Sequence, residues 1–104
     1  MELTSIGKVI EIEGDTFKIL INKEYEPELK GVERLDKLLV VYWIFNPEEK
    51  PFYEEKGLFA THYEGRPNPL GIEVAEIVGI DSNFITMTGL HARINADILD
   101  LRPI

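Results

Sequence analysis

The apolar run from Leu38 to Phe45 restricts most what this chain can fold into. It reads LLVVYWIF, and it is far shorter than the roughly 20 residues that a helix needs to cross a bilayer. Valine, isoleucine and aromatic residues dominate it, as is typical of strands that are covered on both faces. We therefore predict a central strand that is buried on both sides, in a mainly β fold.

Turn residues between alternating segments predict two hairpins around this strand. Glu13-Gly14-Asp15 separates segments 5–12 and 16–21, and Asp81-Ser82-Asn83 separates segments 72–80 and 84–88. Gly, Asp, Asn and Ser are the residues that tight turns favour. A last strand is predicted over 99–102. The sequence contains no internal repeat and no low-complexity tract, so its 104 residues are predicted to form one domain.

Two further segments are predicted to lie outside the sheet. Apolar residues at helical spacing follow Pro27, which predicts a short helix or helical turn over 27–35. Segment 46–56 is rich in Pro and Glu and predicts a loop, in which Phe52 and Tyr53 are free to close over a ligand.

Composition excludes several classes of protein. The absence of Cys removes disulfides, thiolate nucleophiles and thiolate zinc sites. The N-terminal segment has no basic stretch followed by a long apolar run, so neither a signal peptide nor a membrane span is expected, and a cytoplasmic location is the default. Gln is absent while Glu and Lys are plentiful, which favours a thermophilic source.

The segment Arg66-Pro67-Asn68-Pro69-Leu70-Gly71 is unusually stiff for a surface loop. Each proline fixes its own φ and pushes the preceding residue toward extended backbone, so Arg66 and Asn68 are expected to project in set directions. An Arg in such a place can pair with a carboxylate, and an Asn can bond an adenine edge. The alternatives are a structural turn, with Arg66 held by a neighbouring acid and Asn68 bonding its own backbone.

Four motifs together resemble a known family. The chain carries Gly57 with Phe59-Ala60-Thr61, then Arg66 to Gly71, then Gly89-Leu90, and finally Asp100-Leu101-Arg102-Pro103. In this order and spacing they resemble the TrmO-type (TsaA-like, YaeB-like) methyltransferases, over nearly the whole chain. The resemblance implies a small single-domain β-barrel, not a Rossmann fold, that acts as a homodimer. It also implies S-adenosyl-L-methionine as cofactor and methylation of N6 of threonylcarbamoyl-adenosine in tRNA.

The resemblance also implies which residues contact the cofactor, while the catalytic residues stay unknown. These positions are occupied by Asn46, His62, Arg66, Asn68, Ile72, Gly89, Leu90 and His91. Three of them depart from the family pattern, in which His follows the Phe of the central strand, Arg follows Phe-Ala-Thr and Asp follows Gly-Leu. An early loop that covers the cofactor in longer members is also predicted to be missing, because the first strand passes to the turn at Gly14 at once.

The chemistry of methyl transfer leaves two functions open. Transfer from a sulfonium requires no metal and depends on alignment of donor and acceptor, and no metal-ligand spacing is present. His62 and His91 both stand at site positions, and two imidazoles in one pocket can accept a proton or contact a purine, which favours an enzyme. The alternative is a non-catalytic dimeric barrel that binds S-adenosylmethionine or an adenine nucleotide as a sensor or partner domain, as the missing loop suggests.

Net charge also bears on this choice. Nineteen acidic and eleven basic residues give a formal charge of −8, which disfavours unaided binding of tRNA phosphates and supports the second function. Cations nevertheless lie in or near the motifs and are predicted to form one positively charged patch on an otherwise acidic protein. They are Lys56, His62, Arg66, His91, Arg93 and Arg102.

Overall fold

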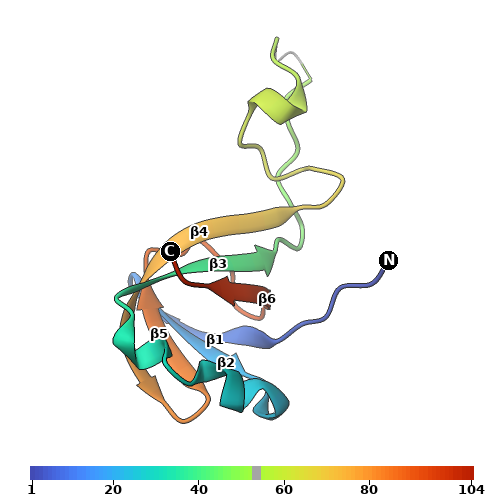
Figure 1. Ribbon diagram of the computed structural model, residues 1–104. Coiled ribbons are helices and arrows are strands. Elements are labelled where there is room, and N and C mark those ends of the chain that lie inside the picture. The colour runs from blue at the N-terminus through green and yellow to red at the C-terminus, as the bar shows by residue number, and fades with distance from the viewer. Residues whose placement is uncertain (53–54) are drawn as a thin grey trace.

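The computed structural model describes residues 1–52 and 55–104 and shows a closed, six-stranded antiparallel β-barrel (Figure 1). Around the barrel the strands follow the order β1-β2-β5-β4-β3-β6. This confirms the predicted fold class. The strands are β1 (Gly7–Glu13), β2 (Thr16–Ile21), β3 (Lys37–Trp43), β4 (Leu70–Asp81), β5 (Phe84–Thr88) and β6 (Asp97–Arg102).

Both predicted hairpins are present. The β1–β2 turn uses Gly14 at φ 61°, and the β4–β5 turn uses Ser82 at φ 57°, so each turn contains the left-handed residue that tight hairpins require. Strand β1 ends at Glu13 and β2 begins at Thr16, so only Gly14 and Asp15 connect them, as the sequence predicted. Strand β4 is longer than predicted: it pairs with β3 up to Glu76, then bends at a bulge between Ile77 and Gly79 while it pairs with β5.

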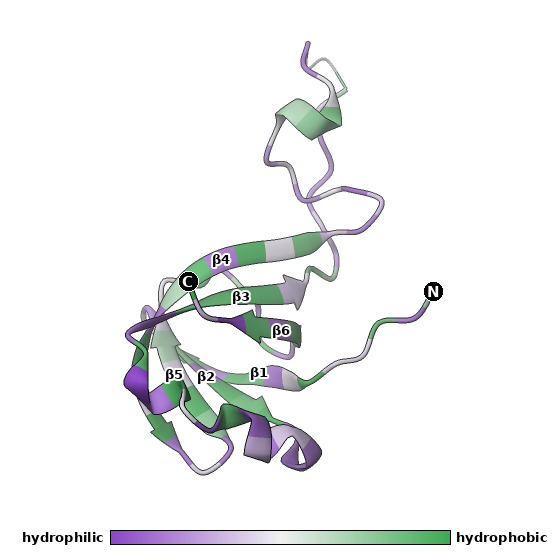
Figure 2. Cartoon of the chain, viewed as in Figure 1, coloured by the Kyte–Doolittle hydropathy of each residue, from purple (hydrophilic) through white to green (hydrophobic). Residues whose placement is uncertain are grey.

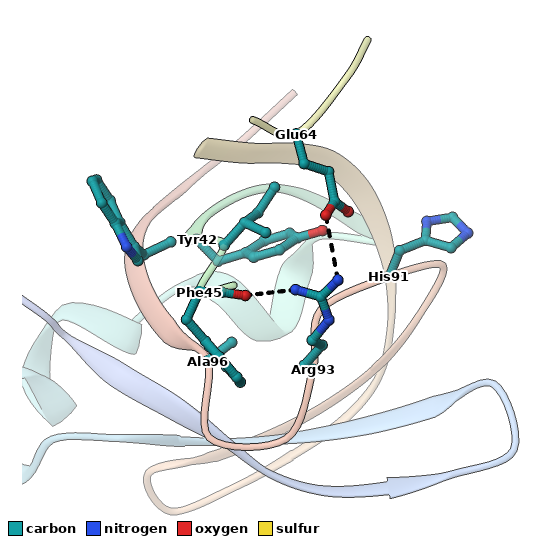
Figure 3. A pocket seen from close by; sticks show the side chains of 8 residues that line it. Tyr42, Phe45, Glu64, His91, Arg93 and Ala96 are labelled. Carbon is teal, nitrogen blue, oxygen red and sulfur yellow. Dashed lines mark hydrogen bonds and ion pairs between the residues drawn. The ribbon is translucent and has the colours of Figure 1, made fainter. Parts of the chain in front are cut away.

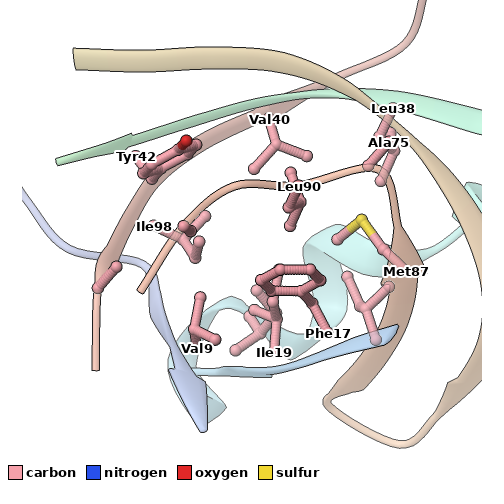
Figure 4. Close-up of a cluster of buried hydrophobic side chains, with 14 of the residues drawn as sticks. Val9, Phe17, Ile19, Leu38, Val40, Tyr42, Ala75, Met87, Leu90 and Ile98 are labelled. Carbon is pink, nitrogen blue, oxygen red and sulfur yellow. The ribbon is translucent and has the colours of Figure 1, made fainter. Parts of the chain in front are cut away.

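The inner faces of the strands fill the barrel with apolar side chains, as Figure 4 shows. In a closed barrel every strand has two neighbours, so the prediction of a central strand does not apply to β3, which lies between β4 and β6. The expectation that it is buried on both faces is wrong. Leu38, Val40 and Tyr42 point into the core, whereas the alternate residues from Leu39 to Trp43 are only half-buried on the outside, because no second layer covers the outer face of the barrel here.

The predicted helix over 27–35 is two 3₁₀-helices, η1 (Lys23–Leu29) and η2 (Val32–Arg34). The boundary was misplaced because Pro27 lies inside η1 and not at its start. Gly31, at φ 95°, separates the two turns in a conformation that no helix can continue through. No helix in residues 1–52 and 55–104 is long and apolar enough to cross a membrane.

The long connection between β3 and β4 stands away from the barrel, and it carries the short 3₁₀-helix η3 (Leu58–Ala60) (Figure 1). It includes the predicted loop 46–56, in which Phe52 is fully exposed. Tyr53, expected to close over a ligand with Phe52, lies outside the described residues. Where this connection returns to β4, it passes over the rim of the barrel, next to the segment that joins β5 to β6.

Candidate functional site

A groove of about 650 Å³ lies where the β3–β4 connection returns to the barrel. This volume lies within the range of roughly 300–1,000 Å³ that is usual for small-molecule sites. Its walls combine barrel strands, the returning connection and the β5–β6 segment. The lining residues are Tyr42, Ile44, Thr61, His62, Tyr63, Glu64, Arg66, Leu70, Gly71, Ile72, Glu73 and His91.

Glu73 connects three parts of this site. Its Oε1 accepts the backbone N–H of His91 at 3.0 Å and also the hydroxyl of Tyr42. Its Oε2 contacts Nδ1 of the His91 ring. Gly71, Glu73 and Ala75 face the inside of β4, so the alternation of the strand brings the carboxylate to the mouth of the barrel, with its side chain only 19% exposed.

These contacts change the proton affinities of both partners. Burial, together with the hydrogen bond to Glu73 and the charge of that carboxylate, raises the pKa of the Tyr42 phenol far above its ordinary value. The phenol therefore stays protonated and acts as a donor. The hydrogen bond to Glu73 and its negative charge also raise the pKa of His91, whose ring remains open to solvent.

Arg93 ties the β5–β6 segment to the β3–β4 connection, as Figure 3 shows. Its Nη1 donates to the carbonyl of Phe45 at 2.6 Å and to that of Asn46 at 3.3 Å, and its Nη2 lies 3.3 Å from Glu64 Oε1. The same Glu64 oxygen accepts the backbone N–H of Glu48 at 3.1 Å. One guanidinium thus joins three chain segments at the edge of the groove.

Arg66 organises the returning connection. Its Nη1 donates to the carbonyl oxygens of Thr61 and Tyr63, each at 3.0 Å, and its guanidinium lies 6.0 Å from the centre of the Phe59 ring. In the part of the chain that the structure describes, no carboxylate pairs with Arg66, so the alternative of a surface arginine held by an acid finds no support there. Arg66 also borders the groove.

The structure brings together four of the eight positions that the resemblance implied. His62, Arg66, Ile72 and His91 border the groove. The other four lie elsewhere. Leu90 is buried in the core, Asn68 lines a separate surface hollow beside Trp43 and Leu99, Asn46 contributes its carbonyl to Arg93, and Gly89 makes the turn out of β5 at φ 94°.

Sequence reasoning missed Tyr42, Glu64 and Glu73. In the sequence Tyr42 is only one residue of an apolar strand, and Glu64 is one acid among many. Glu73 left a signal: it is a carboxylate within the predicted strand 72–80, in phase with the small residues Gly71 and Ala75. A charge in phase with inward-facing small residues indicates a polar group at the end of a barrel. No group of three His, Cys, Asp or Glu side chains suited to a metal ion occurs in the described residues.

The sequence is similar to that of a known family and to several named proteins. A family model described as the tRNA-methyltransferase O N-terminal domain matches residues 8–104. A probable S-adenosyl-L-methionine-binding protein of Archaeoglobus fulgidus is 31% identical over 96 residues, which cover 86% of this chain and 26% of that protein. An S-adenosyl-L-methionine-binding protein of the same organism is 29% identical over 92 residues, 82% of this chain and 66% of the relative.

Solved structures share the fold. A crystal structure of TrmO superposes on the whole chain with a TM-score of 0.84 at 18% identity, and one of TrmO from Pseudomonas aeruginosa does so with a TM-score of 0.80 at 18% identity. The chain corresponds to 57% and 55% of those two proteins, respectively. It therefore spans only part of the length of the relatives that it matches.

Proposed function

Because the chain belongs to the tRNA-methyltransferase O N-terminal domain family, we propose that the groove at the barrel mouth binds S-adenosyl-L-methionine. We propose further that the protein uses it to methylate N6 of threonylcarbamoyl-adenosine in tRNA, in the cytoplasm. The names of the relatives support the first step, and the family supports the second. The observation that carries the proposal is a groove of about 650 Å³ that opens beside groups of both charges.

The residues of the groove suit the chemistry of this cofactor. Its methionyl part carries a carboxylate and an ammonium group, so a matching site needs a cation and an anion close together. Arg66 supplies a guanidinium for the carboxylate. Glu64 and Glu73 supply negative charge for the ammonium and sulfonium groups, and the side chains of Tyr63 and Ile72 offer apolar surface for the adenine. When bound, the cofactor would supply an electrophilic methyl group.

Calorimetry tests the cofactor step directly. S-adenosylmethionine and S-adenosylhomocysteine, titrated into the protein, should each bind at one site per chain. Ile72 and Val78 lie on the same strand and are 60% and 62% exposed, but only Ile72 borders the groove. Ile72→Trp should therefore weaken binding at least tenfold, while the matched Val78→Trp should not. Equal binding by both variants would place the ligand elsewhere, and no binding by the wild type would refute the proposal.

The acceptor is tested with labelled methyl groups and tRNA. Transfer of label to tRNA that contains the threonylcarbamoyl modification, and not to tRNA without it, would support the enzyme. Cofactor binding without transfer to either tRNA would favour the second candidate, a binding domain without catalytic activity. One observation keeps that candidate open: only Gly14 and Asp15 connect β1 to β2, where the resemblance implied an early loop over the cofactor.

We also propose that the protein is a homodimer through the outer face of β3 and β4. This face is apolar: Leu39 pairs with Val74 across the ladder, and Val74 is 49% exposed; both strands are mostly hydrophobic in Figure 2. A dimer would place two sets of site cations on one body, which would help an acidic protein approach tRNA. Sedimentation should give twice the mass of the chain, and Val74→Asp should halve it.

A further inference from the structure

We propose that His91, oriented by Glu73, accepts the proton that the acceptor nitrogen loses when it is methylated. This inference rests on the proposed function and adds a catalytic residue to it.

The Glu73 carboxylate holds His91 at two points. One oxygen accepts the His91 backbone N–H at 3.0 Å, and the other contacts Nδ1 of the ring. Since a carboxylate accepts and does not donate, the proton of the neutral imidazole lies on Nδ1. Nε2 then carries the lone pair, which is the form that a general base requires.

The free nitrogen is accessible. The His91 side chain is 86% exposed, whereas the Glu73 side chain that holds it is 19% exposed. Figure 3 shows the ring directed away from the Arg93–Glu64 pair, and His91 borders the same groove as Arg66 and His62. An acceptor that enters the groove from solvent can therefore meet Nε2 while the other ring nitrogen stays on Glu73.

The neighbouring groups cannot take this role as well. Tyr42 donates its hydroxyl to Glu73, and its raised pKa keeps it protonated. Arg66 and Arg93 remain charged at any accessible pH, and Glu64 is paired with Arg93. His62 borders the groove, but in residues 1–52 and 55–104 no carboxylate bonds its ring to set the tautomer.

The proton transfer balances in charge. The acceptor N–H bond breaks, its electron pair stays on the nitrogen, and the proton adds to the lone pair of Nε2. The nitrogen uses its electron pair to bond the methyl group, and the electrons of the broken carbon–sulfur bond remain on the sulfur. The imidazolium that forms lies against the Glu73 carboxylate, which stabilises its charge, and it then releases the proton to water.

The experiment compares His91→Gln, Glu73→Gln and the control Glu76→Gln, an exposed carboxylate on the outer face of the same strand. First, NMR of the imidazole without any ligand should show Nδ1 protonated in neutral His91. The pKa of His91 should fall in Glu73→Gln and not in Glu76→Gln. Second, the rate of single-turnover methylation should rise with pH, and its midpoint should fall at the pKa that NMR gives for His91.

At saturating S-adenosylmethionine, His91→Gln should lower the single-turnover rate about 100-fold and remove its pH dependence. Glu73→Gln should shift the pH profile to lower pH in step with the NMR value. A protonated Nε2 in the neutral ring would overturn the inference, as would an unchanged rate and pH profile in His91→Gln. Failure of the wild type to bind S-adenosylmethionine would instead refute the proposed function itself. Cofactor binding therefore distinguishes failure of the proposed function from failure of the inference about His91.

Discussion

Gly71 lies opposite Tyr42 in the β3–β4 ladder, and the Tyr42 ring occupies the space where a side chain at Gly71 would stand. A Cβ built at Gly71 would come within 2.2 Å of Cζ of that ring. The glycine therefore allows the phenol to lie across β4 and to place its hydroxyl on Glu73, two residues further along the strand. Gly71, the last residue of segment 66–71, is thus required for packing inside the barrel as well as for the loop.

Gly71→Ala should destabilise the protein. The methyl group would force the buried Tyr42 ring aside, and overpacking of this kind costs about 1–3 kcal/mol. Urea unfolding measures the loss. Gly79→Ala is the matched control, because Gly79 is on the same strand and its Cβ would meet nothing within 4 Å. If Gly71→Ala were as stable as Gly79→Ala, the close packing of Tyr42 on Gly71 would be refuted.

Tyr42→Phe tests the hydroxyl separately. At pH 8 the variant should be about 1 kcal/mol less stable, since Glu73 loses a donor. The folded state raises the pKa of Tyr42 above its ordinary value of 10.0, so above pH 10 the unfolded chain releases a proton that the folded chain keeps. The free energy of unfolding of the wild type should therefore fall toward that of Tyr42→Phe as pH rises. Urea unfolding from pH 8 to about 11 measures this, and a constant difference would contradict it.

The pair Glu73–His91 should give a pH dependence at lower pH. The raised pKa of His91 means that its contribution to stability is complete below pH 6.5, its ordinary pKa, and is lost as pH rises through the raised value. The difference in the free energy of unfolding between the wild type and Glu73→Gln should therefore shrink across this range. Because His91 is exposed, we expect a change of only a few tenths of a kcal/mol. Thermal unfolding at pH 5 and pH 9 measures it, and an advantage that grows with pH would exclude the pair.

Arg66→Ala should loosen the returning connection without unfolding the barrel. The substitution removes the donor to the Thr61 and Tyr63 carbonyls, each bond being worth about 1 kcal/mol. Amide exchange in segment 61–65 should accelerate about tenfold or more, while exchange in β2 and β5 stays unchanged. Arg34→Ala, at an exposed position in η2, serves as control. Unchanged exchange in Arg66→Ala would mean that these carbonyl bonds do not hold the loop.

The sequence predicted the hairpins well, because their turns depend on local residues such as Gly14 and Ser82. It predicted β3 as an apolar strand but not as one buried on one face only, since burial of the outer face depends on what the rest of the chain leaves uncovered. The site followed a similar division. His62, Arg66 and His91 were found through motifs, whereas Tyr42 and Glu73 meet only when β3 and β4 pair. A contact across a ladder has no signature in either strand alone.

The barrel closes where β1 pairs with β6 at Gly7–Ile98 and Lys8–Asp97. Beyond this short seam, Val9 exchanges backbone hydrogen bonds with Asn95 and Ala96, at the end of the segment that carries His91 and Arg93. This segment thus continues the backbone pairing that closes the barrel. Local opening of this pairing would separate the site residues before the rest of the barrel unfolds. A ligand that binds both Arg66 and His91 would therefore stabilise the folded barrel as a whole.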